Sequence, residues 1–196
     1  MKSLMVGTMF TQYRIKKFWT WFKNNHFKLN QNTEHLTEFA IILKKIHPGL
    51  TFEFKFTNNV NLLIISADGN KNLFELVTKI VSQAPEIKNW KTIAFRQPKE
   101  FSTVEIDDTI LSIDDVYARY NILDSKVKID LFIKNYIESS NMTACVFILL
   151  DNLFGEYFVE TMIENITVTA LEDFDNESKI IAVKHLPQNI FINMGE

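Results

Sequence analysis

The chain has 196 residues, of which 46% are hydrophobic and 23% are charged, and its formal net charge is −3 at pH 7. This composition excludes an intrinsically disordered chain, and the small net charge argues against nucleic-acid binding through bulk electrostatics. No stretch reaches the roughly 18 to 20 apolar residues of a membrane span and no signal-peptide pattern occurs, so we expect a cytoplasmic protein. The single cysteine, Cys145, excludes an intrachain disulfide and is expected to be buried.

Charge is distributed unevenly along the chain. Residues 1–49 carry eight Lys or Arg and two acidic residues, whereas residues 150–196 carry two Lys or Arg and nine acidic residues. Either the two ends attract one another in the fold, or the N-terminal helices present a basic docking surface.

The first predicted element is an amphipathic helix over residues 12–28. Its apolar stripe has the spacing i, i+3, i+4, i+7 and consists of Ile15, Phe18, Trp19 and Phe22. A second amphipathic helix follows and is stopped by Pro48-Gly49. Residues 10–48 are therefore predicted to form a helical hairpin that lies on one face of a sheet.

The first helix also carries candidate partner-surface residues, namely Trp19, Trp21 and Lys17. Tryptophan beside lysine is typical of a helix that docks on a membrane surface or stacks on single-stranded nucleic acid. The same aromatic residues also fit a core position or a contact with a protein partner.

Residues 51–97 are predicted to form a β-β-α-β unit. Three phenylalanines, Phe52, Phe54 and Phe56, alternate with polar residues, which indicates a half-buried strand. Asn58-Asn59 suits a two-residue turn into an antiparallel, largely apolar strand over residues 60–67.

The rest of this unit is a crossover. Asp68-Gly69-Asn70 offers oxygens to cap a helix whose apolar stripe covers residues 73–84. A strand over residues 91–97 follows, and a connection of this kind places it parallel to its neighbour.

The plan recurs after residues 98–115, which are predicted to be an irregular connecting loop. The loop contains five carboxylates, but their spacing matches no calcium loop. Residues 116–171 form the second predicted β-β-α-β unit, and the tail 172–196 contains a possible edge strand at 180–183. We therefore predict a single α+β domain over residues 1–196, with a mixed, mainly antiparallel sheet and the helical hairpin packed on it.

Ligands of such folds tend to bind beyond the carboxyl ends of parallel strands. The predicted ligand-binding residues are Asp68, Asn70, Arg96 and Gln97 at the strand ends of the first unit, and Asn152 and Glu156 after the long helix of the second. Arg96 could clamp a carboxylate or phosphate, or it could simply pair with Asp68. The sequence contains no catalytic, metal or cofactor motif.

Several phrases of the sequence resemble a family of bacterial proteins of about this length. They are Phe18-Trp19-Thr20-Trp21-Phe22, Ile65-Ser66-Ala67-Asp68-Gly69-Asn70, Ile93-Ala94-Phe95-Arg96-Gln97, and Leu150-Asp151-Asn152 with Gly155-Glu156-Tyr157. The resemblance spans most of the chain and implies a bacterial, cytoplasmic setting. The family has no established activity, so the resemblance implies no catalytic residue.

Three function classes follow from the sequence. The first is a non-enzymatic binding or regulatory module for a protein partner or a small anionic ligand. The second is a small hydrolase that uses Asp68 or Glu156 as a base. The third is docking on a membrane surface or a nucleic acid through the first helix, of which nucleic acid is disfavoured by the net charge.

Overall fold

The computed structural model describes residues 2–30, 33–173 and 179–195. The chain divides into two compact units, unit 1 (Met1–Phe95) and unit 2 (Arg96–Glu196). Unit 1 contains 13 Lys and Arg against 6 Asp and Glu, whereas unit 2 contains 8 against 18. The charge asymmetry seen at the chain ends is therefore a property of the two units. The single domain over residues 1–196 stays a prediction.

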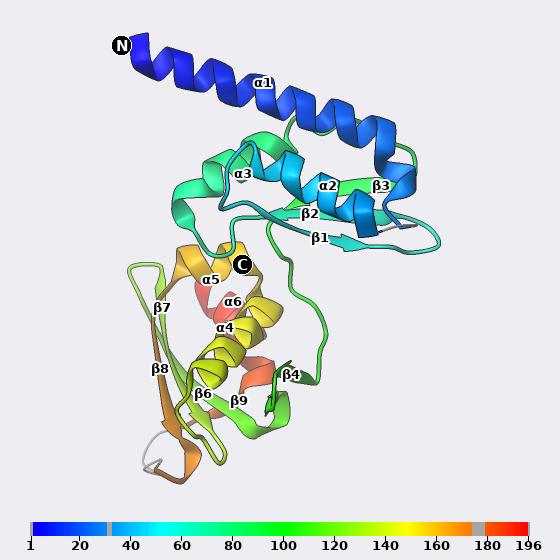
Figure 1. Ribbon diagram of the computed structural model, residues 1–196. Helices are drawn as coiled ribbons and strands as arrows, with labels where there is room; N and C mark the ends of the chain where they lie inside the picture. Colours follow the sequence, from blue (N-terminus) through cyan, green and yellow to red (C-terminus); the bar gives the residue numbers. More distant parts are fainter. Residues whose placement is uncertain (1, 31–32, 174–178, 196) are drawn as a thin grey trace. The chain divides into compact units, whose positions relative to one another are not determined.

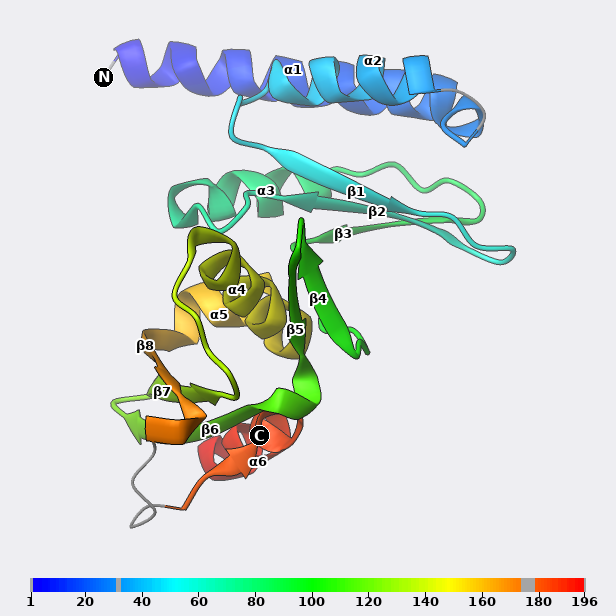
Figure 2. The same cartoon turned by 60° about the horizontal axis from the view of Figure 1, so that its bottom comes forward.

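Unit 1 is a three-stranded sheet with helices on one face (Figures 1 and 2). Its strands are β1 (Thr51–Lys55), β2 (Asn61–Ser66) and β3 (Trp90–Ala94), in the order β1-β2-β3. Its helices are α1 (Lys2–Asn25), α2 (Thr33–Lys44) and α3 (Phe74–Val81). β2 pairs antiparallel with β1 and parallel with β3, as the β-β-α-β pattern predicts.

The core of unit 1 is built from aromatic rings of α1, α2 and the sheet. Phe39 of α2 lies 4.6 Å from Phe52 and 4.9 Å from Phe54, measured between ring centroids. Phe22 of α1 lies 5.1 Å from Trp90 of β3 in an edge-to-face arrangement. Edge-to-face pairs add about 0.5–1.5 kcal/mol to the burial of their area. The helical hairpin therefore packs on the face of the sheet that carries Phe52 and Phe54.

Unit 2 contains a hairpin and a four-stranded mixed sheet. The hairpin is β4 (Thr103–Ile106) with β5 (Thr109–Ser112). The sheet has the order β8-β7-β6-β9 and is formed by β6 (Val116–Leu123), β7 (Lys126–Ile133), β8 (Ile163–Ala170) and β9 (Ile181–Ala182). The helices are α4 (Ser140–Phe154), α5 (Glu156–Met162) and α6 (Leu186–Met194).

One face of this sheet forms the core of unit 2 with the three helices. Alternate residues of β7 point inward, namely Val127, Ile129, Leu131 and Ile133. Cys145 of α4 is buried in this core, as predicted, and desolvation raises the pKa of its thiol. β7 is antiparallel to β6 and parallel to β8, so both units contain a hairpin followed by a parallel crossover. The α+β class, the two β-β-α-β units and the N-terminal helical hairpin are confirmed.

Two predicted turns behave differently. Asp124-Ser125 forms a two-residue turn with positive φ at both positions, as type I′ hairpins require. The predicted turn at Asn58-Asn59 is wrong, because the loop between β1 and β2 has five residues, 56–60. Thr57 stabilises the longer loop, since its hydroxyl donates to the Val60 carbonyl at 2.7 Å and accepts from the Val60 amide at 3.0 Å.

The predicted connecting loop over residues 98–115 is also wrong. Residues 103–106 and 109–112 form β4 and β5, in which Val104 and Leu111 are buried, and the Asp107-Asp108 pair makes the turn with φ 48° at Asp107. The acidic residues are compatible with this hairpin, because aspartate is common in turns. Similarly, the strand predicted over 91–97 ends at Ala94, because Phe95 takes a positive φ of 65°.

Helical structure extends beyond the prediction at three places. α1 begins at Lys2, since Gly7 costs only about 1 kcal/mol within a helix. α5 and α6 were not predicted, although Pro187 at the start of α6 and Gly195 after its end are ordinary helix boundary signals. In the tail, β9 matches the possible edge strand, and residues 174–178 lie outside the described part of the chain.

Among the described residues, no single helix is long and apolar enough to cross a membrane. α4 and α5 reach such a length together, but the chain bends by 105° between them.

Candidate binding groove between the N-terminal helices

The two tryptophans of α1 have different environments. Trp19 is 5% exposed, and its indole N–H donates to the Ile80 carbonyl of α3 at 2.9 Å. A buried tryptophan needs such a partner for its N–H group. Trp19 is therefore a core residue, and its prediction as a partner-surface residue is wrong. The apolar stripe of α1, to which it belongs, faces the core of unit 1.

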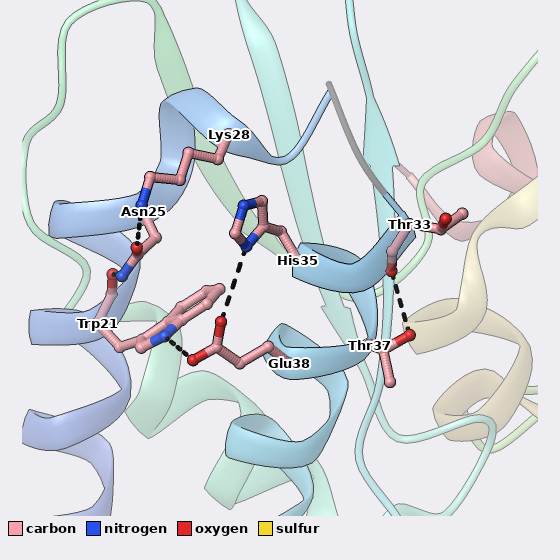
Figure 3. A network of polar contacts seen from close by, with 7 residues as sticks. All are labelled: Trp21, Asn25, Lys28, Thr33, His35, Thr37 and Glu38. Atoms are coloured by element: carbon pink, nitrogen blue, oxygen red, sulfur yellow. Dashed lines mark hydrogen bonds and ion pairs between the residues drawn. The ribbon is translucent and has the colours of Figure 1, made fainter.

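Trp21 lies off that stripe and is half-buried. Its indole N–H donates to Oε1 of Glu38 on α2 at 2.9 Å (Figure 3). Its ring lies 6.0 Å from the ring of Phe39, which is also on α2. Glu38 also lies 3.8 Å from Nδ1 of His35 through its other carboxylate oxygen. The indole ring of α1 is thus fixed in orientation by its contacts with α2.

The end of α1 is tied down by a second set of polar contacts. The Asn25 side-chain amide donates to the Trp21 carbonyl at 2.9 Å, and the Lys28 ammonium donates to Oδ1 of Asn25 at 3.4 Å (Figure 3). These bonds hold the Asn25 side chain between the last turn of α1 and the turn that follows it.

A groove of about 640 Å³ opens beside Trp21 between α1 and α2. It is lined from α1 by Tyr13, Arg14, Lys16, Lys17, Thr20, Trp21, Asn24 and Asn25, and from the α2 side by Ile42 and Lys45. Its volume falls in the range of about 300–1,000 Å³ that is typical of ligand sites. The lining contains no carboxylate, so the charge of the groove is positive.

The cations gather at one end of the groove. α2 runs back along α1 (Figure 2), and Glu38 of α2 contacts Trp21 of α1. Lys45 follows Glu38 by seven residues, and so it approaches the part of α1 that precedes Trp21 and holds Arg14, Lys16 and Lys17. Among the described residues, none of these four cations has an ion pair with an acid. Lys17 lies over the Tyr13 ring, with 4.9 Å between its Nζ and the ring centroid. A cation without an ion-pair partner is stabilised by its hydration water. A carboxylate of an acidic ligand can take the place of this water.

Glu156 and Asn152, the predicted ligand-binding residues of the second β-β-α-β unit, each bond the backbone of residues 96–99. The Glu156 carboxylate is fully buried and accepts the backbone N–H of Arg96 at 3.1 Å, while the Glu156 N–H donates to the Arg96 carbonyl at 3.0 Å. The Lys99 N–H donates to the Asn152 carbonyl at 2.9 Å. A fully buried carboxylate bound to a backbone amide has no access to a substrate, so these contacts describe a clasp that holds residues 96–99.

The four predicted ligand-binding residues of the first β-β-α-β unit are divided between unit 1 and unit 2. Asp68 and Asn70 belong to unit 1, whereas Arg96 and Gln97 belong to unit 2 and lie beyond the end of β3. Asn70 caps the turn before α3, since its side-chain oxygen accepts the Asn72 N–H at 3.2 Å. The shared site of these four residues stays a prediction.

The outer face of the unit 2 sheet carries a polar cluster centred on Asp130. Arg119 donates two hydrogen bonds to Asp130, at 3.0 and 2.9 Å, and the Thr167 hydroxyl donates to its other oxygen. The Thr167 hydrogen bond, followed by Arg119, lowers the pKa of Asp130. All three side chains are on adjacent strands in register, which is typical of a cross-strand pair. Within the described residues, no three His, Cys, Asp or Glu side chains converge as a metal site would require.

Comparisons with family models, curated proteins and solved structures find no match. The resemblance to a bacterial family therefore stays a prediction.

Most of the groove residues were not predicted from the sequence. Of the three partner-surface residues, Trp21 and Lys17 do line it. A signal for Tyr13 and Asn25 was present, because positions 13, 17, 21 and 25 of α1 recur at i+4 and form a second line beside the apolar stripe. Ile42 and Lys45 could not be found in this way, since only the packing of α2 on α1 brings them to the same groove.

Proposed function

We propose that the protein is a non-enzymatic binding module that docks an acidic segment of a protein partner in the α1–α2 groove. The observation that carries this proposal is the set of four cations around a partly aromatic groove, none of them ion-paired within the described chain. As the family resemblance implies, we place this binding in the cytoplasm of a bacterial cell.

The lining of the groove supports a protein segment as the ligand. Tyr13, Trp21 and Ile42 supply apolar surface, and aromatic residues and arginine are the side chains that carry most binding energy at protein interfaces. Asn24 and Asn25 add amide groups that can bond a peptide backbone. Opposite charge accelerates the encounter of the partners, while the apolar contacts hold the complex.

A direct test uses a fluorescein-labelled oligo-glutamate peptide and measures fluorescence anisotropy at low and physiological salt. The double variant Lys16→Glu/Lys17→Glu is expected to bind at least about tenfold more weakly than the natural chain. The matched control is Lys88→Glu/Lys91→Glu, which changes the net charge of unit 1 by the same amount at exposed positions outside the groove lining. It is expected to lose far less, because salt screens distant charges beyond about 8–10 Å.

Equal losses in the two double variants would show that bulk charge, and not the groove, binds the peptide, and the proposal would be abandoned. Citrate, titrated by calorimetry, separates the other ligand class. If citrate bound tightly and oligo-glutamate did not, the ligand would be a small anion and a protein partner would be excluded.

A further inference from the structure

We infer that the segment bound in the α1–α2 groove is an amphipathic helix, which packs as a third helix with its acidic residues at the end formed by Arg14, Lys16, Lys17 and Lys45. The inference rests on the proposed function and adds the conformation and the orientation of the ligand.

The first observation is the shape of the groove. Its lining follows α1 from Tyr13 to Asn25, which corresponds to about 18 Å at 1.5 Å per residue. Tyr13, Lys17, Trp21 and Asn25 recur at i+4, so they form a straight ridge along the helix. A groove between two helices that run side by side accepts another helix, because ridges of side chains fit into such grooves.

The second observation is the apolar surface that continues this line. α1 has 24 residues and spans about 36 Å, whereas α2 has 12 and spans about 18 Å, so much of α1 has no α2 beside it. Met9 lies one turn before Tyr13 on the same ridge and is 75% exposed, and Phe10 beside it is 61% exposed. A helix laid along the groove would cover both side chains.

The third observation is the polarity of the groove. One end carries four cations, while the other end carries the Asn24 and Asn25 amides next to Trp21. An occupant with acidic residues at one end and apolar anchors along one face matches both the charge and the apolar floor at Ile42. A ligand without such polarity would leave either the cations or the floor without a complement.

Charge and shape select against two other occupants. A second copy of the chain docked through the same groove would bring together two linings that each carry four cations and no carboxylate, which is repulsive. A lipid surface would contact the protruding Met9 and Phe10, but it would not enter a groove whose apolar floor, Ile42, lies between two helices.

The test compares two labelled peptides of about 18 residues with the same charge. In the first, leucines at i, i+3, i+4 and i+7 form one face and glutamates gather at one end; in the second, a proline replaces one central residue and prevents the helix. The first peptide is expected to bind at least about tenfold more tightly by anisotropy and to gain helical circular dichroism on binding. Equal affinity of the two peptides would overturn the helical conformation, while their shared loss in Lys16→Glu/Lys17→Glu would leave the proposed function standing.

Two variants test the apolar floor. Ile42→Ala is expected to weaken binding of the helical peptide several-fold, whereas Ile41→Ala, which changes the neighbouring exposed residue outside the groove, is expected to leave it unchanged. Tryptophan emission during urea unfolding checks that both variants fold. Equal effects of the two variants would overturn the inference, as would vesicles of anionic lipid that bind the chain and displace the peptide. If neither peptide nor oligo-glutamate binds, the proposed function itself fails.

Discussion

Replacing Gly155 by alanine is expected to destabilise unit 2 strongly. Gly155 lies between α4 and α5 with φ 82° and ψ 148°, a conformation that essentially only glycine adopts. A Cβ atom there would lie 2.9 Å from Cδ of Pro98 and 3.1 Å from the Arg96 carbonyl oxygen. Carbon atoms make favourable contacts only at about 3.5–4.0 Å, so the clasp around residues 96–99 would have to shift.

The size of the effect follows from two contributions. The backbone strain costs about 1–3 kcal/mol, and the overpacking against Pro98 costs about another 1–3 kcal/mol. Gly195 provides a matched control, since it has the same φ of 82° but no atom within 4 Å of the added Cβ. With ψ 24° it lies in the left-handed helical region, where alanine costs about 1–2 kcal/mol.

The two units can be followed separately in the same sample. All three tryptophans, Trp19, Trp21 and Trp90, belong to unit 1, so their emission reports its unfolding. Cys145 is the single cysteine and is buried in unit 2, so its reaction with a thiol reagent reports the opening of that unit. Burial also raises the pKa of the thiol, which slows the reaction of the folded chain further.

Gly155→Ala is expected to increase the labelling rate of Cys145 at least about 30-fold under native conditions, which corresponds to about 2 kcal/mol. Gly195→Ala is expected to increase it much less. If the two variants label at the same rate, the contact with Pro98 carries no weight and the account of the clasp is wrong.

Three further outcomes are expected. Trp19→Phe should lower the free energy of unfolding by about 1–3 kcal/mol because it removes a buried hydrogen bond together with part of a buried ring, whereas Trp21→Phe should cost under about 1 kcal/mol; urea unfolding followed by circular dichroism compares them. Thr167→Val should raise the pKa of Asp130 toward its ordinary value, as measured by carbon NMR titration. Because the folded pKa is lowered, Asp130 contributes stability above its unfolded pKa of about 3.9 and loses it as pH falls through the folded pKa, so acid unfolding of Thr167→Val should show less of this loss.

The elements with strong periodicity could be predicted from the sequence. The alternating phenylalanines of β1 and the stripe of α1 gave both the element and its buried face, since packing followed the local pattern. Short elements could not be predicted in this way. β4 and β5 have four residues each, and their acidic turn and neighbours hid an alternation that only pairing makes stable.

The candidate groove was less accessible to sequence reasoning than the fold. A helical wheel separates Trp19 from Trp21, but it does not show that α3 supplies the carbonyl that buries Trp19 or that Glu38 fixes Trp21. Glu156 illustrates the opposite error. Its position after an apolar helix suggested a functional carboxylate, whereas a backbone amide 60 residues away in the chain uses it as an acceptor. Such pairings depend on tertiary contacts that no local pattern contains.

The occupation of the groove can be measured most directly by fluorine NMR. The three tryptophans, labelled with 5-fluorotryptophan, give one resonance each. Trp21 lines the groove, Trp19 is buried in the core of unit 1, and Trp90 lies on β3. Titration with oligo-glutamate is predicted to shift the Trp21 resonance alone, and Lys16→Glu/Lys17→Glu is predicted to abolish the shift. An unchanged Trp21 resonance at saturating peptide, or an equal shift of Trp90, would contradict the assignment of binding to this groove.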